Sequence, residues 1–212
     1  MLTLIKREIE DHLVYFIAAI IASITGVFTL IYFAYNYQHE ETRVMISPLM
    51  TPFAILLITG LYLMGGSQMY QDKNKKISAF LSTLAVSRNQ IFLARLITGL
   101  LAILIILVPG AVTGQILLNT YASTLTYPIY PYYTIEIFSS LFLTALAIYC
   151  IGLQSGFHSS KMYHAIGMVL SYVLLPIILI KGFGLQLSVI LLLFIVASLV
   201  YTWKKFIKAP LI

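Results

Sequence analysis

Long blocks of apolar residues alternate with short polar stretches along most of the chain. Six such blocks can be delimited, at residues 14–35, 48–70, 91–118, 135–153, 165–180 and 185–203. A helix of about 20 apolar residues is long enough to cross the hydrocarbon core of a bilayer. The pattern therefore predicts an all-α integral membrane protein with six transmembrane helices, forming a single transmembrane domain over residues 1–212.

The composition agrees with the hydropathy pattern. Hydrophobic residues make up 60% of the chain and charged residues 9%, and the mean hydropathy is +0.97. A soluble domain of this length needs a larger charged surface. The net charge of +6 comes from basic residues gathered in short loops, which indicates orientation in a lipid membrane and no nucleic-acid partner.

The basic residues divide unequally between the two predicted sides of the membrane. Of the 13 lysines and arginines, only Arg43 and Lys181 fall outside the side that holds both termini and residues 71–90 and 154–164. Because cytoplasmic loops carry an excess of lysine and arginine, we expect a multi-pass plasma-membrane protein with both termini in the cytoplasm.

Residues 1–13 predict an amphipathic helix that lies in the membrane interface. Apolar residues recur at helical spacing at Leu2, Ile5, Ile9 and Leu13, and polar residues such as Lys6, Arg7 and Glu8 occupy the other side. Such a helix binds the interface through its apolar face. A plain extension of the first transmembrane helix is the alternative.

Several residues inside the apolar blocks carry structural expectations. Gly60 and the pair Gly65 and Gly66 predict close packing of the second block against a neighbouring helix. Pro109, followed by Gly110, interrupts the long third block, which predicts a tilted or kinked helix. The single cysteine, Cys150, is interpreted as a small core residue.

Residues 119–134 form a loop rich in tyrosine and proline. Tyrosine prefers the headgroup layer of a membrane, so an interfacial belt is the simpler interpretation. An aromatic surface that contacts a transported substrate is the alternative.

The chain contains no motif for catalysis. It lacks the Gly-x-x-x-x-Gly-Lys-Ser/Thr phosphate loop, so it is not predicted to hydrolyse ATP, and no metal or cofactor site is predicted. The segment 152–156 lacks serine-protease spacing, and His158 and His164 are interpreted as surface residues. An intramembrane enzyme is therefore disfavoured.

Charged side chains are scarce inside the apolar blocks. Glu136 and Lys181 lie at block ends, and Arg95, one turn into the third block, is expected to extend its side chain to the interface. Carriers driven by ion gradients usually place a carboxylate near the midplane, and none is found here.

The most hydrophilic stretch, residues 71–90, predicts a short amphipathic helix between the second and third transmembrane helices. Its apolar stripe is Ile77, Phe80, Leu81 and Leu84. An amphipathic helix on the basic side can insert its apolar face into a groove of a partner protein. The candidate coupling residues of this stretch are Asp72, Lys76, Ile77, Phe80, Leu81, Leu84, Val86, Ser87 and Arg88.

This stretch resembles the coupling region of ABC-2 type permeases, the membrane subunits of many ABC exporters. The family pattern has an acidic residue, then Leu-Leu-Ser-x-Pro-Val-Ser-Arg and a following isoleucine. Asp72, residues 80–84, residues 86–88 and Ile91 match it, and Leu4 to Glu8 are similar to the entry helix of the family.

The sequence departs from the family pattern at three places. Ala85 stands where the family often has proline, and Lys76-Ile77 stands where it usually has Gly-Thr. The link between the last two blocks is only residues 181–184, so we expect an outer gate that is reduced or built from the tyrosine-rich loop.

The resemblance implies an ATP-driven exporter of a hydrophobic or amphipathic substrate. It implies a separate ABC ATPase subunit that holds ATP and Mg²⁺, and a second permease subunit, identical or paralogous. Two other interpretations remain open: a membrane scaffold that recruits a cytoplasmic protein without transport, and a secondary transporter driven by an ion gradient.

Overall fold

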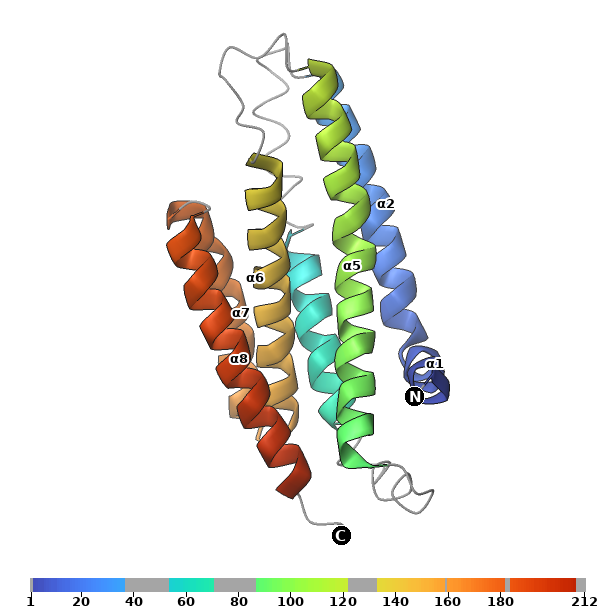
Figure 1. Cartoon of the computed structure of the whole chain (residues 1–212), viewed down its shortest axis with the longest axis vertical. Helices are drawn as coiled ribbons and strands as arrows, with labels where there is room; N and C mark the ends of the chain where they lie inside the picture. Colours follow the sequence, from blue (N-terminus) through green and yellow to red (C-terminus); the bar gives the residue numbers. More distant parts are fainter. Residues whose placement is uncertain are drawn as a thin grey trace.

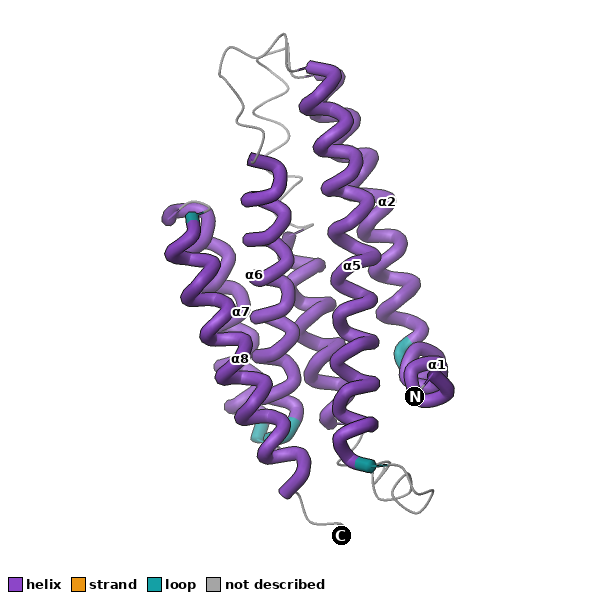
Figure 2. Tube along the Cα trace, viewed as in Figure 1, coloured by secondary structure: helices purple, strands orange, loops and turns teal. Residues whose placement is uncertain are grey.

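The computed structural model describes residues 2–36, 54–70, 87–121, 133–158, 160–181 and 184–208. Every regular element in these ranges is a helix, and they contain no strand (Figure 2). The helices are α1 (Leu2–Asp11), α2 (Leu13–Asn36), Ala54–Tyr70, α5 (Arg88–Tyr121), α6 (Tyr133–Gly156), α7 (Lys161–Lys181) and α8 (Leu185–Lys208). The predicted all-α class is confirmed.

Among the described residues, four helices are long and apolar enough to cross a membrane, which indicates a membrane protein. The qualifying segments are Leu13–Tyr32, Arg88–Thr120, Ile135–Gly156 and Leu185–Ile207. The described part of the second predicted block, Ala54–Tyr70, is a shorter apolar helix. A total of six spans therefore stays a prediction.

Figure 1 shows the long helices running along the longest axis of the molecule, with α1 seen nearly end-on at one end. At that same end, α5 begins, α8 ends and the helix Ala54–Tyr70 ends (Figure 1). Every described lysine and arginine except Lys181 belongs to this end of the bundle. We call it the basic end.

Helix α5 is one continuous helix that packs against α1, α2, α6 and α8. Pro109 lies inside it, and the hydroxyl of Thr113 donates a hydrogen bond to the Pro109 carbonyl over 2.8 Å. The sequence break at Pro109 and Gly110 therefore does not divide this helix.

The helix Ala54–Tyr70 and α6 approach each other so closely that their backbones touch. A Cβ atom added at Gly65 would lie 2.5 Å from the Tyr149 carbonyl oxygen, and one at Gly152 would lie 2.3 Å from the Tyr62 carbonyl oxygen. Gly152 and Gly156 are four residues apart, the spacing that lets membrane helices pack closely. The predicted close packing at Gly65 is confirmed.

The prediction was wrong for Gly60, because no atom of the described residues lies within 4 Å of a Cβ built there. Gly60 is on a different face of its helix from Gly65, since residues five apart are not neighbours on a helix surface. Gly66 is intermediate, with the Gly152 carbonyl oxygen 3.7 Å from its Cβ position.

The predicted polar loop 154–164 is shorter than expected. Helix α6 continues to Gly156 and α7 begins at Lys161, where the Ser160 hydroxyl accepts a hydrogen bond from the Met162 amide over 3.3 Å. Hydropathy marks where a chain leaves the hydrocarbon, but helices continue into the polar layer when their ends are capped. Cys150 is fully buried, as predicted.

Candidate functional site

Most of the predicted coupling segment lies outside the described residues. This applies to Asp72, Lys76, Ile77, Phe80, Leu81, Leu84 and Val86, whereas Ser87 and Arg88 are described. The two helices that flank the segment are also described, so its points of attachment are known.

Ser87 caps the start of α5. Its hydroxyl accepts a hydrogen bond from the Gln90 amide over 3.4 Å, and the Gln90 side-chain oxygen accepts one from the Ser87 amide over 3.2 Å. This reciprocal pair is a capping box, which satisfies backbone donors that the first helical turn leaves free. Ser87 therefore has a local structural role besides any role in coupling.

Arg88 and Asn89 join the start of α5 to the end of α8. The Arg88 guanidinium donates a hydrogen bond to the Ile207 carbonyl over 2.5 Å, and the Trp203 indole donates one to the Asn89 side-chain oxygen over 3.1 Å. A displacement of the coupling segment at this point would be transmitted to α8 as well as to α5.

Helix α1 presents its two faces differently from the prediction. Leu2 is 83% exposed and Leu13 is also exposed, so the two ends of the apolar stripe are available to the membrane. Ile5 is half-buried, and Ile9 packs against the buried cluster that contains Phe16. Glu8 and His12, which the sequence places on the polar side, are buried against the bundle. Helix α1 therefore docks on the bundle partly through ionisable side chains.

An ion pair between α1 and α5 is the centre of this contact. Nε of Arg95 lies 3.4 Å from Oε1 of Glu8, and these side chains are 2% and 12% exposed. The expectation that Arg95 extends to the interface is wrong, because Glu8 offers it a buried partner. The guanidinium also lies 5.3 Å from the centroid of the Phe206 ring of α8, within the range of a cation–π contact.

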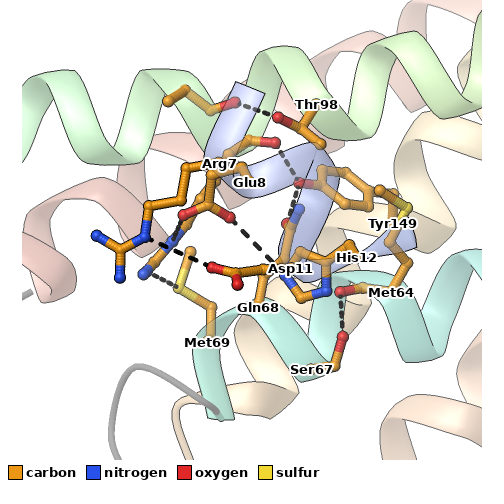
Figure 3. Close-up of polar contacts among 12 residues, drawn as sticks. Arg7, Glu8, Asp11, His12, Met64, Ser67, Gln68, Met69, Thr98 and Tyr149 are labelled. Atoms are coloured by element: carbon orange, nitrogen blue, oxygen red, sulfur yellow. Dashed lines mark hydrogen bonds and ion pairs between the residues drawn. The ribbon is translucent and has the colours of Figure 1, made fainter. Parts of the chain in front are cut away.

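Tyr149 of α6 connects this ion pair to the helix Ala54–Tyr70. Its hydroxyl lies 2.6 Å from the side-chain oxygen of Gln68 (Figure 3) and 3.0 Å from the carbonyl oxygen of Arg95, and these two acceptors share its single proton. Gly99 of α5 makes room for the ring, because a Cβ there would lie 2.2 Å from Cζ of Tyr149. We call Glu8, His12, Gln68, Arg95 and Tyr149 the polar cluster.

Two buried atoms of the polar cluster have no hydrogen-bond partner among the described residues, Nδ1 of His12 and Nε2 of Gln68. Nε2 of His12 lies 3.7 Å from Oε2 of Glu8. Burial lowers the pKa of His12 below its usual value; neighbouring Asp11 opposes the shift and Arg95 adds to it. The imidazole is therefore held neutral at pH 7 and can gain a proton at lower pH.

The two histidines interpreted as surface residues have different surroundings. His158 stacks on Tyr163 with ring centroids 4.1 Å apart, and its Nε2 lies 3.2 Å from the Lys205 ammonium of α8. His164 contributes its carbonyl oxygen, which accepts a hydrogen bond from the Tyr62 hydroxyl over 2.8 Å. Both residues serve packing at the basic end.

Sequence reasoning missed the polar cluster as a unit. One signal was available: Glu8 and His12 are four residues apart, so they share a helix face, and Arg95 is the only charged residue inside the third apolar block. The three-dimensional convergence of four helices was not encoded in any local spacing.

Searches of protein-family models, of curated proteins and of solved structures find no match to this chain.

Proposed function

We propose that this chain is the membrane subunit of an ATP-driven exporter, which moves a hydrophobic or amphipathic substrate with a separate ABC ATPase. Two copies, or one copy and a paralogue, would enclose the path. The ATPase would bind the basic end, in the cytoplasm, and its ATP and Mg²⁺ would supply the energy. The proposal starts from the resemblance of residues 72–91 to the coupling region of ABC-2 type permeases.

The observation that supports it best is the position of the two helices that flank the coupling segment. The helix Ala54–Tyr70 ends and α5 begins at the basic end, beside α1 (Figure 1). The segment between them therefore leaves from and returns to the end of the bundle that the positive-inside rule assigns to the cytoplasm. A cytoplasmic ATPase could contact it there.

The contacts of the polar cluster supply a route from that segment into the bundle. Gln68 lies two residues before the end of its helix, and Arg95 lies two turns after the start of α5. Both contact Tyr149 of α6, and Arg95 also pairs with Glu8 of α1. A movement of the segment would therefore displace α1, α5 and α6 together. Such a joint displacement would let closure of the ATPase shift the bundle from one of two conformations to the other.

The experiment is a pair of charge substitutions on the two faces of the predicted coupling helix. Phe80→Asp with Leu84→Asp places two carboxylates in the apolar stripe, and we expect loss of ATPase binding and of substrate export. Ala79→Asp with Thr83→Asp is the matched control, because it adds the same charges at the same spacing on the opposite face. The control should keep both activities.

Membrane insertion and thermal stability of both double variants must equal those of the unmodified chain for the comparison to hold. Intact ATPase binding by the Phe80/Leu84 variant would contradict docking through this helix. If both double variants lost ATPase binding and export equally, the added charge alone, and not its position in the apolar stripe, would explain the loss.

The second candidate is a carrier driven by a proton gradient, and the polar cluster is the observation that favours it. Glu8, His12 and Arg95 form a buried group of ionisable side chains, and such groups take part in proton relays. Gln68, Arg95 and Tyr149 each lie within about two turns of the helix ends at the basic end, which fits a helix-docking contact better than a relay at the middle of the spans. Uptake or efflux that follows an imposed pH gradient without any ATPase would favour this candidate.

A further inference from the structure

A groove between α2 and α5 opens on the side of the bundle. Its volume is about 340 Å³, and its apolar lining includes Ile20, Ile24 and Phe28 of α2 with Ile105 and Pro109 of α5. This volume is within the range of small-molecule sites, about 300–1,000 Å³. Phe28 is 69% exposed, so the groove is accessible from the lipid phase.

The groove lies near the middle of two candidate membrane spans. Ser23 is central in the segment Leu13–Tyr32, and Ile105 is central in Arg88–Thr120. At this depth a bilayer offers hydrocarbon and almost no water. A polar group that faces the groove would therefore have no partner from the membrane itself.

Two residues that line the groove, Ser23 and Ile105, carry hydrogen-bonding groups that matter here. The Ser23 side chain lines the groove, is 8% exposed, and makes no hydrogen bond to any described residue. By contrast, the hydroxyl of Thr25 on the same helix bonds back to the Ile21 carbonyl over 2.8 Å. Pro109 has no N–H, so the Ile105 carbonyl lacks its helical donor.

A donor and an acceptor left unsatisfied in hydrocarbon are costly, and a ligand that carries one hydroxyl could satisfy both. An ordinary acyl chain has no such group at this depth, because its polar headgroup lies at the interface. We propose that the groove binds a hydrocarbon-rich molecule with one hydroxyl, which Ser23 and the Ile105 carbonyl hold at mid-membrane depth. That this molecule is the exported substrate rests on the proposed function.

The test uses two photoactivatable probes of equal chain length, a diazirine-bearing long-chain alcohol and the matching diazirine alkane. The purified protein is labelled in detergent without ATPase or nucleotide, and the labelled peptides are identified by mass spectrometry. We expect the alcohol to label α2 or α5 at the groove more strongly than the alkane. Ser23→Ala should lower alcohol labelling roughly fivefold, the change expected for one hydrogen bond, and leave alkane labelling unchanged.

Thr25→Ala is the matched control, since it also removes a hydroxyl from α2 but away from the groove. It should not change labelling by either probe. Equal labelling by alcohol and alkane, or alcohol labelling that survives Ser23→Ala, would overturn the site and indicate general contact with lipid. Because no ATPase is present, this labelling result does not depend on whether the chain is part of an exporter. Selective labelling of the groove, with no release of the probe when ATPase and ATP are added, would support the binding site and contradict the exporter proposal.

Discussion

The carboxylate of Glu8 lies 3.4 Å from Nε of Arg95, and this buried ion pair joins the N-terminal helix to α5. Helix α1 lies across the end of the bundle, whereas α5 runs the length of the bundle (Figure 1). The pair therefore connects an element exposed to the membrane interface with the helix that follows the predicted coupling segment.

Breaking this ion pair should destabilise the protein more than removing both partners. Glu8→Leu or Arg95→Met alone leaves a buried charge without its partner, which costs about 3–5 kcal/mol. The double variant Glu8→Leu with Arg95→Met should recover part of that loss, because no unpaired charge remains. Thermal unfolding of the four proteins in detergent gives the interaction energy as a double-mutant cycle.

The pair Lys6 and Glu10 provides the control for that cycle. These side chains lie 3.9 Å apart on the exposed side of α1, and such surface pairs contribute at most about 0.5 kcal/mol. Lys6→Gln with Glu10→Gln should therefore leave the unfolding temperature nearly unchanged. Strictly additive effects for Glu8 and Arg95 would show that they do not interact in the folded protein.

Gly152 should not tolerate a methyl group. Gly152→Ala would place Cβ 2.3 Å from the Tyr62 carbonyl oxygen, so the two helices must separate, at a cost of about 1–3 kcal/mol. Gly60→Ala is the control on the facing helix, where nothing in the described part of the chain lies within 4 Å of the added Cβ and alanine favours the helix. A fall in unfolding temperature for Gly60→Ala as large as that for Gly152→Ala would contradict the described crossing.

His12 should make the protein less stable in mild acid. Because burial lowers its pKa in the folded state, the unfolded chain takes up a proton first as the pH falls. The contribution of neutral His12 to the free energy of unfolding is therefore fully present above the unfolded-state pKa of about 6.5. It decreases as the pH falls below that value. Unfolding temperatures from pH 8 to pH 5 should decrease less steeply for His12→Gln, and an unchanged slope would exclude His12 as the cause.

Ser87 should act on stability through its cap. Ser87→Ala removes the hydroxyl that accepts the Gln90 amide, and we expect a loss of about 1 kcal/mol. Ser87→Asp should restore most of it, because aspartate is also a good cap. If Ser87→Ala instead abolished ATPase binding with no change in unfolding temperature, the residue would be a docking residue and not a cap.

The all-α fold and the approximate helix positions could be predicted from the long hydrophobic blocks. A block of about 20 apolar residues is explained by a helix that crosses a membrane. The residues at which the helices begin and end could not be predicted, because hydropathy does not show that Ser87 and Ser160 cap helices in the polar layer. Gly65 was predicted as a packing site, but only the crossing with α6 shows that Gly152 is its counterpart and that Gly60 faces elsewhere.

The polar cluster was the largest feature that the sequence did not predict. An amphipathic helix was expected to turn all its charges outward, because burying a single charge is costly. Glu8 is buried instead, because the Arg95 guanidinium pairs with its carboxylate. The two residues are 87 positions apart in the sequence. Such a pairing depends on the tertiary arrangement and has no local pattern.

The most direct test of the exporter proposal is to purify the tagged chain from its native membranes in mild detergent and identify the proteins that accompany it. We expect an ABC ATPase to accompany the chain, and we expect the complex to lose ATP hydrolysis in the Phe80→Asp and Leu84→Asp variant. Purification of the chain alone, or with a partner that has no nucleotide site, would contradict the exporter and favour a scaffold or a gradient-driven carrier.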